Sequence, residues 1–342
     1  MDPLPARGIV DKRGGPPPYF ERVLIPSMAA TSSLFLVTGG AGFIGSHVVE
    51  SLLADGHRVR VLDNFSTGNR ANLDFARGNR RLEVLRGDLR NLETVARAVR
   101  GVSVVFHQAA MRSVPRSVAD PLGANDHNVN GTLHVLEAAR RAGVRRVVYA
   151  SSSSVYGDNP ELPKREEQTL TPISPYAVSK AANEMYATVW TRLYGVETVG
   201  LRYFNVFGPR QDPASEYAAV IPRFILWGLR GEPLEVHGDG QQSRDFTYID
   251  NVVDANVLAA RAPAASGEAF NVGCGERVSL LDIIGRLEKL LGRALPRRHT
   301  PSRAGDVPHT LADIGKAKRL MDYTPLVDFD EGLRRTVDFF KR

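Results

Sequence analysis

Two residues able to carry out acid–base chemistry, Tyr176 and Lys180, stand four positions apart in the segment Tyr-Ala-Val-Ser-Lys. Residues at i and i+4 share a helix face, so the phenol and the ammonium can point into one cleft. A tyrosine with a reference pKa of about 10 is a poor base at neutral pH, and a nearby cation lowers that pKa by stabilising the phenolate. The pair predicts a tyrosine that exchanges protons with a bound substrate.

A run of four serines, Ser151 to Ser154, directly follows the β-rich segment 146–150, which precedes this pair in the sequence. A hydroxyl at the end of a strand can hydrogen-bond the reacting oxygen or relay its proton to the tyrosine. A Tyr-x-x-x-Lys spacing alone is common by chance, and its simplest alternative is a solvated helix face. The hypothesis of a catalytic pair therefore depends on the motifs that accompany it.

A glycine pattern supplies the first of these motifs. Gly40, Gly42 and Gly45 fit the spacing G-x-G-x-x-G directly after a predicted strand at 34–38 and before a predicted helix at 42–55. Such glycines allow a tight turn and let backbone amides approach a pyrophosphate, which the positive end of the helix attracts. The segment predicts a dinucleotide site.

Two acidic residues follow the next strands. Asp63 ends the second predicted strand, roughly 20 residues after the glycines, where a carboxylate binds ribose hydroxyls and repels a 2′-phosphate. This position favours NAD over NADP. Asp88 follows the third strand and is expected near the adenine. A solvated acid at a strand end is the alternative for both residues.

The elements that position these motifs alternate between short β-rich runs and helices. This rhythm indicates βαβ units and a mostly parallel sheet, whose ligands bind at the carboxyl ends of the strands. Strands are predicted at 34–38, 58–62, 82–85, 104–107, 146–150 and 197–202, and helices at 42–55, 92–99, 124–142 and 175–194.

The predicted fold is α/β, a Rossmann-type doubly wound parallel sheet with a smaller mixed α/β C-terminal substrate lobe. Beyond about Asn205 the rhythm breaks, and glycine, proline and aspartate become frequent. We expect a disordered extension at 1–33, a dinucleotide-binding domain at 34–205 and a mainly substrate-binding lobe at 206–342. Segments at about 245–263 are expected to return to the first domain.

Composition limits the function classes. The 342 residues carry a net charge of +6, but the arginine pairs form no basic run interleaved with aromatics, so no nucleic acid is expected. The excess charge suits an anionic nucleotide. The single cysteine, Cys274, cannot form an internal disulfide, which favours a reducing, cytoplasmic setting. No apolar run is long enough to span a membrane, and the eight histidines lack metal-ligand spacing, so no metal is expected.

Together the motifs resemble the extended short-chain dehydrogenase/reductase family, and within it the nucleotide-sugar 4-epimerases. The resemblance runs from about Leu34 to the C-terminus. It is carried by Thr-Gly-Gly-Ala-Gly-Phe-Ile-Gly at 38–45, Asn-Val-Asn-Gly-Thr at 128–132, the serine run with Tyr156-Gly157, Ser174-Pro175-Tyr176, Lys180, Leu-Arg-Tyr-Phe-Asn at 201–205, Gly-Asp-Gly at 238–240, Ser-Arg-Asp-Phe at 243–246 and Arg-Ala-Gly-Asp at 303–306.

The resemblance implies a role for each matching residue. Tyr176 is the base, Lys180 its partner, and Ser152 the catalytic hydroxyl four residues before Tyr156. Besides Tyr176 and Lys180, the implied NAD contacts are Gly39, Gly42, Phe43, Ile44, Gly45, Asp63, Asn64, Asp88, Leu89, Gln108, Ala109, Ala110 and Phe204. The implied contacts to a UDP-sugar are Ser113, Ser152, Ser153, Tyr176, Asn205, Gln211, Arg244, Arg303, Asp306 and Thr310.

The implied reaction inverts C4 of a UDP-sugar through a 4-keto intermediate. A 4,6-dehydratase of this family carries an Asp-Glu pair where Ser153 and Ser154 stand, and a decarboxylase carries a carboxylate beside its catalytic hydroxyl. A non-catalytic NAD-sensing protein is expected to lack the Tyr-Lys pair. The small Thr310 suits an N-acetylated sugar, with uronate and glucose analogues as alternatives. By resemblance we also expect a homodimer formed through the helices at 124–142 and 175–194.

Overall fold

The computed structural model describes residues 33–213, 219–301 and 307–342, which belong to one compact unit. The predicted extension at 1–33 falls outside this part except for Ser33, and Arg303 and Asp306 also lie outside it. Where a boundary would separate the two predicted domains stays a prediction.

A parallel sheet of seven strands forms the centre of the fold, in the order β11-β6-β5-β4-β1-β2-β3. This is the predicted Rossmann-type α/β fold. Strands β1 and β4 are almost entirely apolar, because parallel strands are covered by helices on both faces. The strands are β1 (Leu34–Thr38), β2 (Arg58–Asp63), β3 (Leu82–Arg86), β4 (Val104–His107), β5 (Arg146–Ser152), β6 (Glu197–Tyr203) and β11 (Glu268–Val272).

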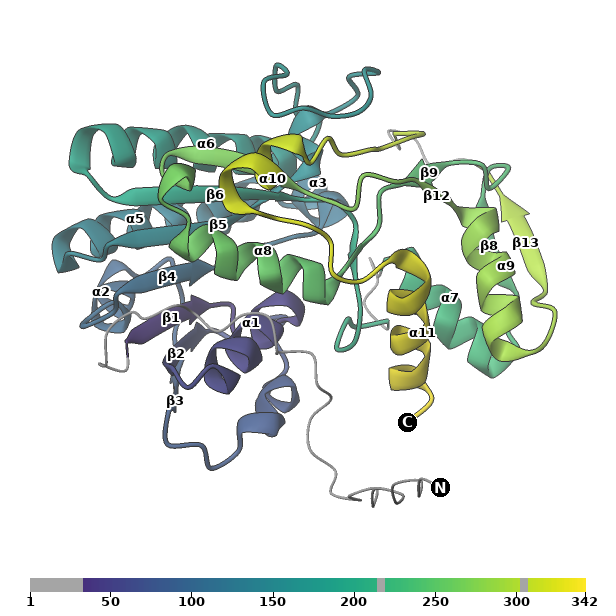
Figure 1. Cartoon of the computed structure of the whole chain (residues 1–342), viewed down its shortest axis with the longest axis horizontal. Coiled ribbons are helices and arrows are strands. Elements are labelled where there is room, and N and C mark those ends of the chain that lie inside the picture. The colour runs from purple at the N-terminus through teal and green to yellow at the C-terminus, as the bar shows by residue number, and fades with distance from the viewer. Residues whose placement is uncertain (1–32, 214–218, 302–306) are drawn as a thin grey trace, which may run out of the picture. The chain divides into compact units, whose positions relative to one another are not determined.

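Helices cover the sheet in two groups (Figure 1). Helices α1 (Phe43–Ala54) and α8 (Ile249–Arg261) pack against each other, and α8 also contacts β5 and β6. The second group contains α2 (Leu92–Ala98), α5 (Gly131–Ala142) and α6 (Pro175–Tyr194). The chain thus returns to the sheet late, through α8 and through the edge strand β11.

The predicted helix at 124–142 is longer and less regular than expected. It begins as α4 (Pro121–Asn125), widens into the π-helical η2 (Asp126–Asn130) and continues as α5. The short α3 (Val114–Ala119) precedes it. π-helical turns inside helices are rare and often occur at functional sites.

The C-terminal part is built from α7 (Val220–Arg230), α9 (Leu280–Leu291), α11 (Phe329–Phe340) and the parallel pair β8 (Leu234–His237) and β13 (Arg297–Thr300). These elements pack against one another (Figure 1). The remaining elements are β7 (Val206–Phe207), β9 (Ser243–Arg244), β10 (Thr247–Tyr248), β12 (Val278–Ser279), α10 (Gly315–Met321), η1 (Arg70–Ala76), η3 (Ser153–Tyr156) and η4 (Pro263–Ala265).

Two hydrophobic cores explain why these parts form one unit. The smaller core joins the sheet to α2 and α5 through residues such as Val95 and Leu136. The larger core begins between the sheet and α1 and continues through α8 into α7, α9 and α11, where Phe224, Ile284 and Leu333 belong to it. Continuous apolar burial of this kind is the main favourable contribution to folding.

Candidate active site

The turn between β1 and α1 is packed so tightly that only glycine fits at two of its positions. Gly39 has φ +68°, and a Cβ there would lie 2.7 Å from the backbone nitrogen of Ala109. A Cβ on Gly45 would lie 2.1 Å from the carbonyl oxygen of Gly39. The glycines therefore bring the turn against β4 and the first turn of α1 against the glycine loop. This is the close backbone packing that a dinucleotide site requires.

A cavity of about 1020 Å³, counting the open solvent at its mouth, lies beside this turn. It is bordered by the ends of β1, β2 and β4, and β1 and β4 flank the point where the strand order reverses. Open parallel sheets bind ligands at this point. Every predicted NAD contact except Tyr176, Lys180 and Phe204 lines the cavity.

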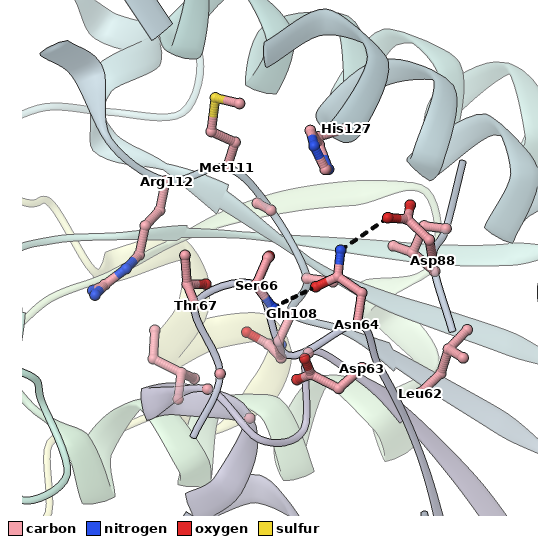
Figure 2. A pocket seen from close by; sticks show the side chains of 18 of the residues that line it. Leu62, Asp63, Asn64, Ser66, Thr67, Asp88, Gln108, Met111, Arg112 and His127 are labelled. Atoms are coloured by element: carbon pink, nitrogen blue, oxygen red, sulfur yellow. Dashed lines mark hydrogen bonds between the residues drawn. The ribbon is translucent and has the colours of Figure 1, made fainter. Parts of the chain in front are cut away.

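The Asp63 carboxylate connects two loops at the cavity wall. One oxygen accepts a hydrogen bond from the Ala41 backbone amide at 2.9 Å, and the other accepts one from Phe65 at 2.8 Å. Next to it, the Asn64 side chain donates to Asp88 at 2.9 Å, as Figure 2 shows. Hydrogen bonding from Arg90 holds the pKa of Asp88 well below its usual range. Both predicted acids thus line the cavity, and Asp88 does so as an ionised carboxylate.

Tyr176, Lys180 and Ser152 come together at the ends of α6 and β5. Lys180 is buried, and its ammonium donates to the Ala150 carbonyl at 2.8 Å and lies 5.9 Å from the centre of the Tyr176 ring. Burial lowers the Lys180 pKa to about 8. Burial raises the pKa of Tyr176, while a hydrogen bond with Ser152 and the positive charge of Arg112 act in the opposite direction. The structure brings the three predicted catalytic residues into one group.

A buried hydrogen-bond chain connects the glycine turn with α6. Thr38 bonds His107 at 2.7 Å, and His107 bonds Thr132 at 3.0 Å through its other ring nitrogen. Thr132 donates to the Asn128 carbonyl at 2.6 Å, and the Asn128 side chain donates to Ser179 at 3.0 Å. Burial lowers the His107 pKa to about 3, so the ring is neutral. Sequence reasoning missed this chain, although Asn128 and Thr132 belong to a motif that carries the resemblance.

The predicted sugar contacts are only partly brought together. Asn205, at φ 28°, donates from its side chain to the Asp245 carbonyl at 3.1 Å and to the Thr310 hydroxyl at 3.3 Å. Arg244 donates a hydrogen bond to the Pro308 carbonyl at 2.8 Å and so holds the segment that contains Thr310. Gln211 is buried and donates to the Val206 carbonyl at 3.1 Å.

Three further predicted residues have local structural roles. The Ser113 hydroxyl caps α3 by accepting from the Arg116 amide at 3.2 Å, and Ser153 begins η3. The Phe204 side chain is fully buried, and its ring centre lies 6.3 Å from that of Tyr156. Phe204 thus belongs to the core and does not line the cavity.

Several cavity residues were not predicted. The cavity is also lined by Leu62, Ser66, Thr67, Gly68, Gly87, Met111, Arg112, Arg116 and His127. Figure 2 shows Met111, Arg112 and His127 around the cavity, with Ser66 and Thr67 in the loop after β2. The Ser-Thr-Gly sequence at 66–68 is typical of a turn at a strand end, and this signal could have identified the loop.

Among the described residues, no group of three or more His, Cys, Asp or Glu side chains is arranged to hold a metal ion. Within the same part of the chain, no helix has the length and apolar character needed to cross a bilayer.

A Rossmann-type sheet with a glycine turn at its switch point and a neighbouring Tyr-x-x-x-Lys pair defines the short-chain dehydrogenase/reductase class. Comparison with known proteins narrows this class. Residues 35–273 match the sequence pattern of the NAD dependent epimerase/dehydratase family. The chain belongs to this family.

The relatives of the chain include UDP-sugar 4-epimerases. The UDP-glucose 4-epimerase of Mycolicibacterium smegmatis is 41% identical over 308 residues, which cover 90% of this chain and 98% of the relative. The structure of UDP-N-acetylglucosamine 4-epimerase from Methanobrevibacter ruminantium in complex with UDP-N-acetylmuramic acid is 39% identical in sequence and has a TM-score of 0.87. The match covers 91% of this chain and 99% of that one. The structure of UDP-glucuronic acid 4-epimerase from Bacillus cereus in complex with UDP-glucuronic acid and NAD is 35% identical in sequence and has a TM-score of 0.84. This match covers 90% of this chain and 99% of that one.

Proposed function

We propose that this protein is an NAD-dependent epimerase that inverts C4 of a UDP-sugar through a 4-keto intermediate. The observation that carries the proposal is the group formed by Tyr176, Lys180 and Ser152, where the phenol lies beside a buried ammonium and a hydroxyl. Membership of the NAD dependent epimerase/dehydratase family and relatives named as UDP-sugar 4-epimerases support it.

The cavity fits NAD. The tightly packed glycine turn suits the close approach of a pyrophosphate, and Asp63, which lines the cavity, is proposed to accept hydrogen bonds from the adenosine ribose. Lys180 is proposed to bind the nicotinamide ribose. When bound, the nicotinamide supplies a hydride acceptor and donor for the sugar carbon, and the protein supplies positioning and proton transfer.

Proton transfer is assigned to Tyr176. Its phenolate takes the proton from the sugar O4 and gives it back after the keto sugar has presented its opposite face. Lys180 stabilises the phenolate by its charge, and Ser152 hydrogen-bonds both the phenol and the reacting oxygen. Because the hydride is returned in each turnover, no external oxidant is needed.

The residues next to Ser152 favour epimerisation over dehydration. A 4,6-dehydratase needs an acid and a base to eliminate water across C5 and C6, and the two positions after Ser152 hold serines. Ser154 instead donates from its hydroxyl to Ser152 at 2.9 Å. A serine hydroxyl has no pKa near neutrality that suits such acid–base work. A decarboxylase of this family carries a carboxylate beside its catalytic hydroxyl, and this chain has serine there.

An N-acetylated UDP-hexose is the proposed substrate, with UDP-glucuronate and UDP-glucose as alternatives. Thr310 is small and half-buried, and it bonds Asn205, which is proposed to contact the sugar nucleotide. A small side chain there leaves space beside the substituent on C2 of the sugar. Arg303 and Asp306 remain proposed contacts of the nucleotide.

We also propose a homodimer through α5 and α6. Helix α6 carries large apolar side chains that are exposed in the single chain, among them Met185 at 66% and Leu193 at 72%. A groove between the two helices is lined by Leu133, Trp190 and Tyr194. Exposed apolar area of this kind marks an interaction surface. Light scattering of the wild type and of Leu193→Glu tests it, and a monomeric wild type contradicts it.

The central experiment incubates the purified protein with one UDP-sugar at a time, without added NAD, and determines the product stereochemistry by NMR. The proposal expects a C4 epimer and cofactor that copurifies with the protein. Protein that carries NAD but yields only a dehydrated or decarboxylated sugar would assign it to another branch of the family.

A further inference from the structure

A buried carboxylate, Glu184, stands one turn after Lys180 on α6. Glu184 and Arg202 are both buried, with 7% and 5% of their surface exposed. Arg202 binds the carboxylate with two nitrogens, Nη2 at 2.7 Å and Nε at 2.9 Å. The Ser151 hydroxyl donates to the same carboxylate. Glu184 is therefore fixed to β5 and β6 at the same time.

This carboxylate acts on the predicted catalytic group in two ways. Ser151 immediately precedes Ser152 on β5, so its hydrogen bond to Glu184 fixes the strand end that carries the catalytic hydroxyl. The negative charge of Glu184 also raises the Lys180 pKa, which burial lowers. Without Glu184, the ammonium and the Arg202 guanidinium would be two buried cations with no carboxylate between them.

Other titratable groups face this cluster from the elements packed around α6. Tyr149 on β5 lines a cavity together with Glu184, and the neutral His107 on β4 is influenced by the charge of Lys180. Tyr156 accepts a hydrogen bond from Arg202 at 2.8 Å. Glu166 and Lys316 line a polar cavity next to Glu184, and Arg112 is the cation that acts on Tyr176. The charge that raises the Lys180 pKa is that of Glu184.

We propose that Glu184 is a positioning residue for the reaction: its carboxylate keeps Lys180 in the ammonium form and holds the end of β5 so that Ser152 stays beside Tyr176. The proposal rests on the function proposed above. Glu184 itself does not line the cofactor cavity.

Two arrangements of Tyr176 and Lys180 contain the same number of protons. One is a phenolate with an ammonium, and the other is a phenol with a neutral amine. Only the first contains the base. Glu184 lies four residues after Lys180 and eight after Tyr176 on the helix, about 6 Å and 12 Å along its axis. Because Coulomb interaction falls with distance, the carboxylate favours the first arrangement.

The test replaces Glu184 with glutamine, which keeps the shape of the side chain and removes its charge. Two quantities are measured: kcat as a function of pH, and the ultraviolet phenolate signal of Tyr176, obtained as the difference from the same protein with Tyr176→Phe. We expect E184Q to retain its bound NAD while kcat and the phenolate fraction near neutral pH both fall by roughly tenfold, the change that one pKa unit produces.

A matched control is Glu197→Gln. Glu197 on β6 accepts a hydrogen bond from the buried Arg146 on β5 at 2.7 Å, at the opposite end of these two strands. Glu197→Gln therefore also removes the negative charge that pairs with a buried arginine. E197Q is expected to keep the phenolate signal and the shape of the pH profile. Equal effects of E184Q and E197Q on both readouts would overturn the proposal, and so would an unchanged E184Q.

A second variant covers the case in which E184Q does not fold. Glu184→Asp keeps the charge but shortens the side chain, and it should retain most of the phenolate signal while kcat falls less than tenfold. Loss of the signal in E184D would overturn the electrostatic role. The phenolate measurement needs no sugar, so it decides the role of Glu184 even if every UDP-sugar proves not to be a substrate.

Discussion

Asn205 donates a hydrogen bond from its side chain to the hydroxyl of Thr310, although the two residues are 105 positions apart in the sequence. Asn205 follows β6, and Thr310 belongs to a segment that β9 holds through the hydrogen bond from the Thr310 amide to the Ser243 carbonyl, at 3.1 Å. The contact joins the parallel sheet to the C-terminal part beside residues proposed to bind the sugar nucleotide.

The first prediction concerns substrate choice. Thr310→Tyr fills the space beside the sugar, so activity on N-acetylated UDP-sugars should be lost while activity on UDP-glucose is spared. Comparison of kcat/KM for the two sugars in wild type and variant measures the effect. Thr310→Ser, which keeps the small hydroxyl, serves as the control. An equal loss on both sugars would show that Thr310 does not border the C2 substituent.

The second prediction concerns the base. Tyr176→Phe removes the phenol without removing the ring, and the epimerase rate should fall by about 10²–10⁴-fold, the usual contribution of general acid–base catalysis. NAD content should be unchanged because the cavity residues remain. Turnover close to that of the wild type in a variant that still carries NAD would remove Tyr176 from the mechanism.

The third prediction concerns the glycine turn. In Gly45→Ala the new Cβ would lie 2.1 Å from the Gly39 carbonyl oxygen, so the turn must shift. We expect a loss of about 1–3 kcal/mol in the free energy of unfolding, as for other overpacked sites, together with weaker NAD binding. Gly285→Ala is the control, because this α9 glycine faces open space and alanine favours helix by up to about 1 kcal/mol. Denaturant titration and NAD titration measure the two effects.

The fourth prediction concerns pH. The positive charge of Arg112 lowers the Tyr176 pKa, and Arg112 is exposed, so solvent weakens its effect. Removing the charge in Arg112→Gln should raise that pKa. Because the base must be deprotonated, the acidic limb of the kcat profile should move to higher pH, and activity below that limb should fall. Arg116→Gln is the control, since Arg116 lines the same cavity, while the charge that lowers the Tyr176 pKa is that of Arg112. A limb that stays in place in R112Q contradicts the prediction.

The sequence by itself predicted the parallel sheet and its glycine turn. Apolar runs of strand length that alternate with helices are local patterns, and strand β1 and helix α6 were predicted with the bounds that the structure has. The Tyr176–Lys180 pair could also be predicted, because residues four apart on a helix share a face whatever surrounds them. Short-range spacing fixes these features.

Only the tertiary structure decided which distant residues meet. Nothing local indicates that Glu268–Val272 would form the seventh strand, that the Glu184 carboxylate would pair with Arg202, or that Thr38, His107 and Thr132 would form one buried chain. Phe204 was expected at the cofactor and lies in the core. Such contacts depend on strand order and on the burial of polar groups, which must find partners wherever the fold places them.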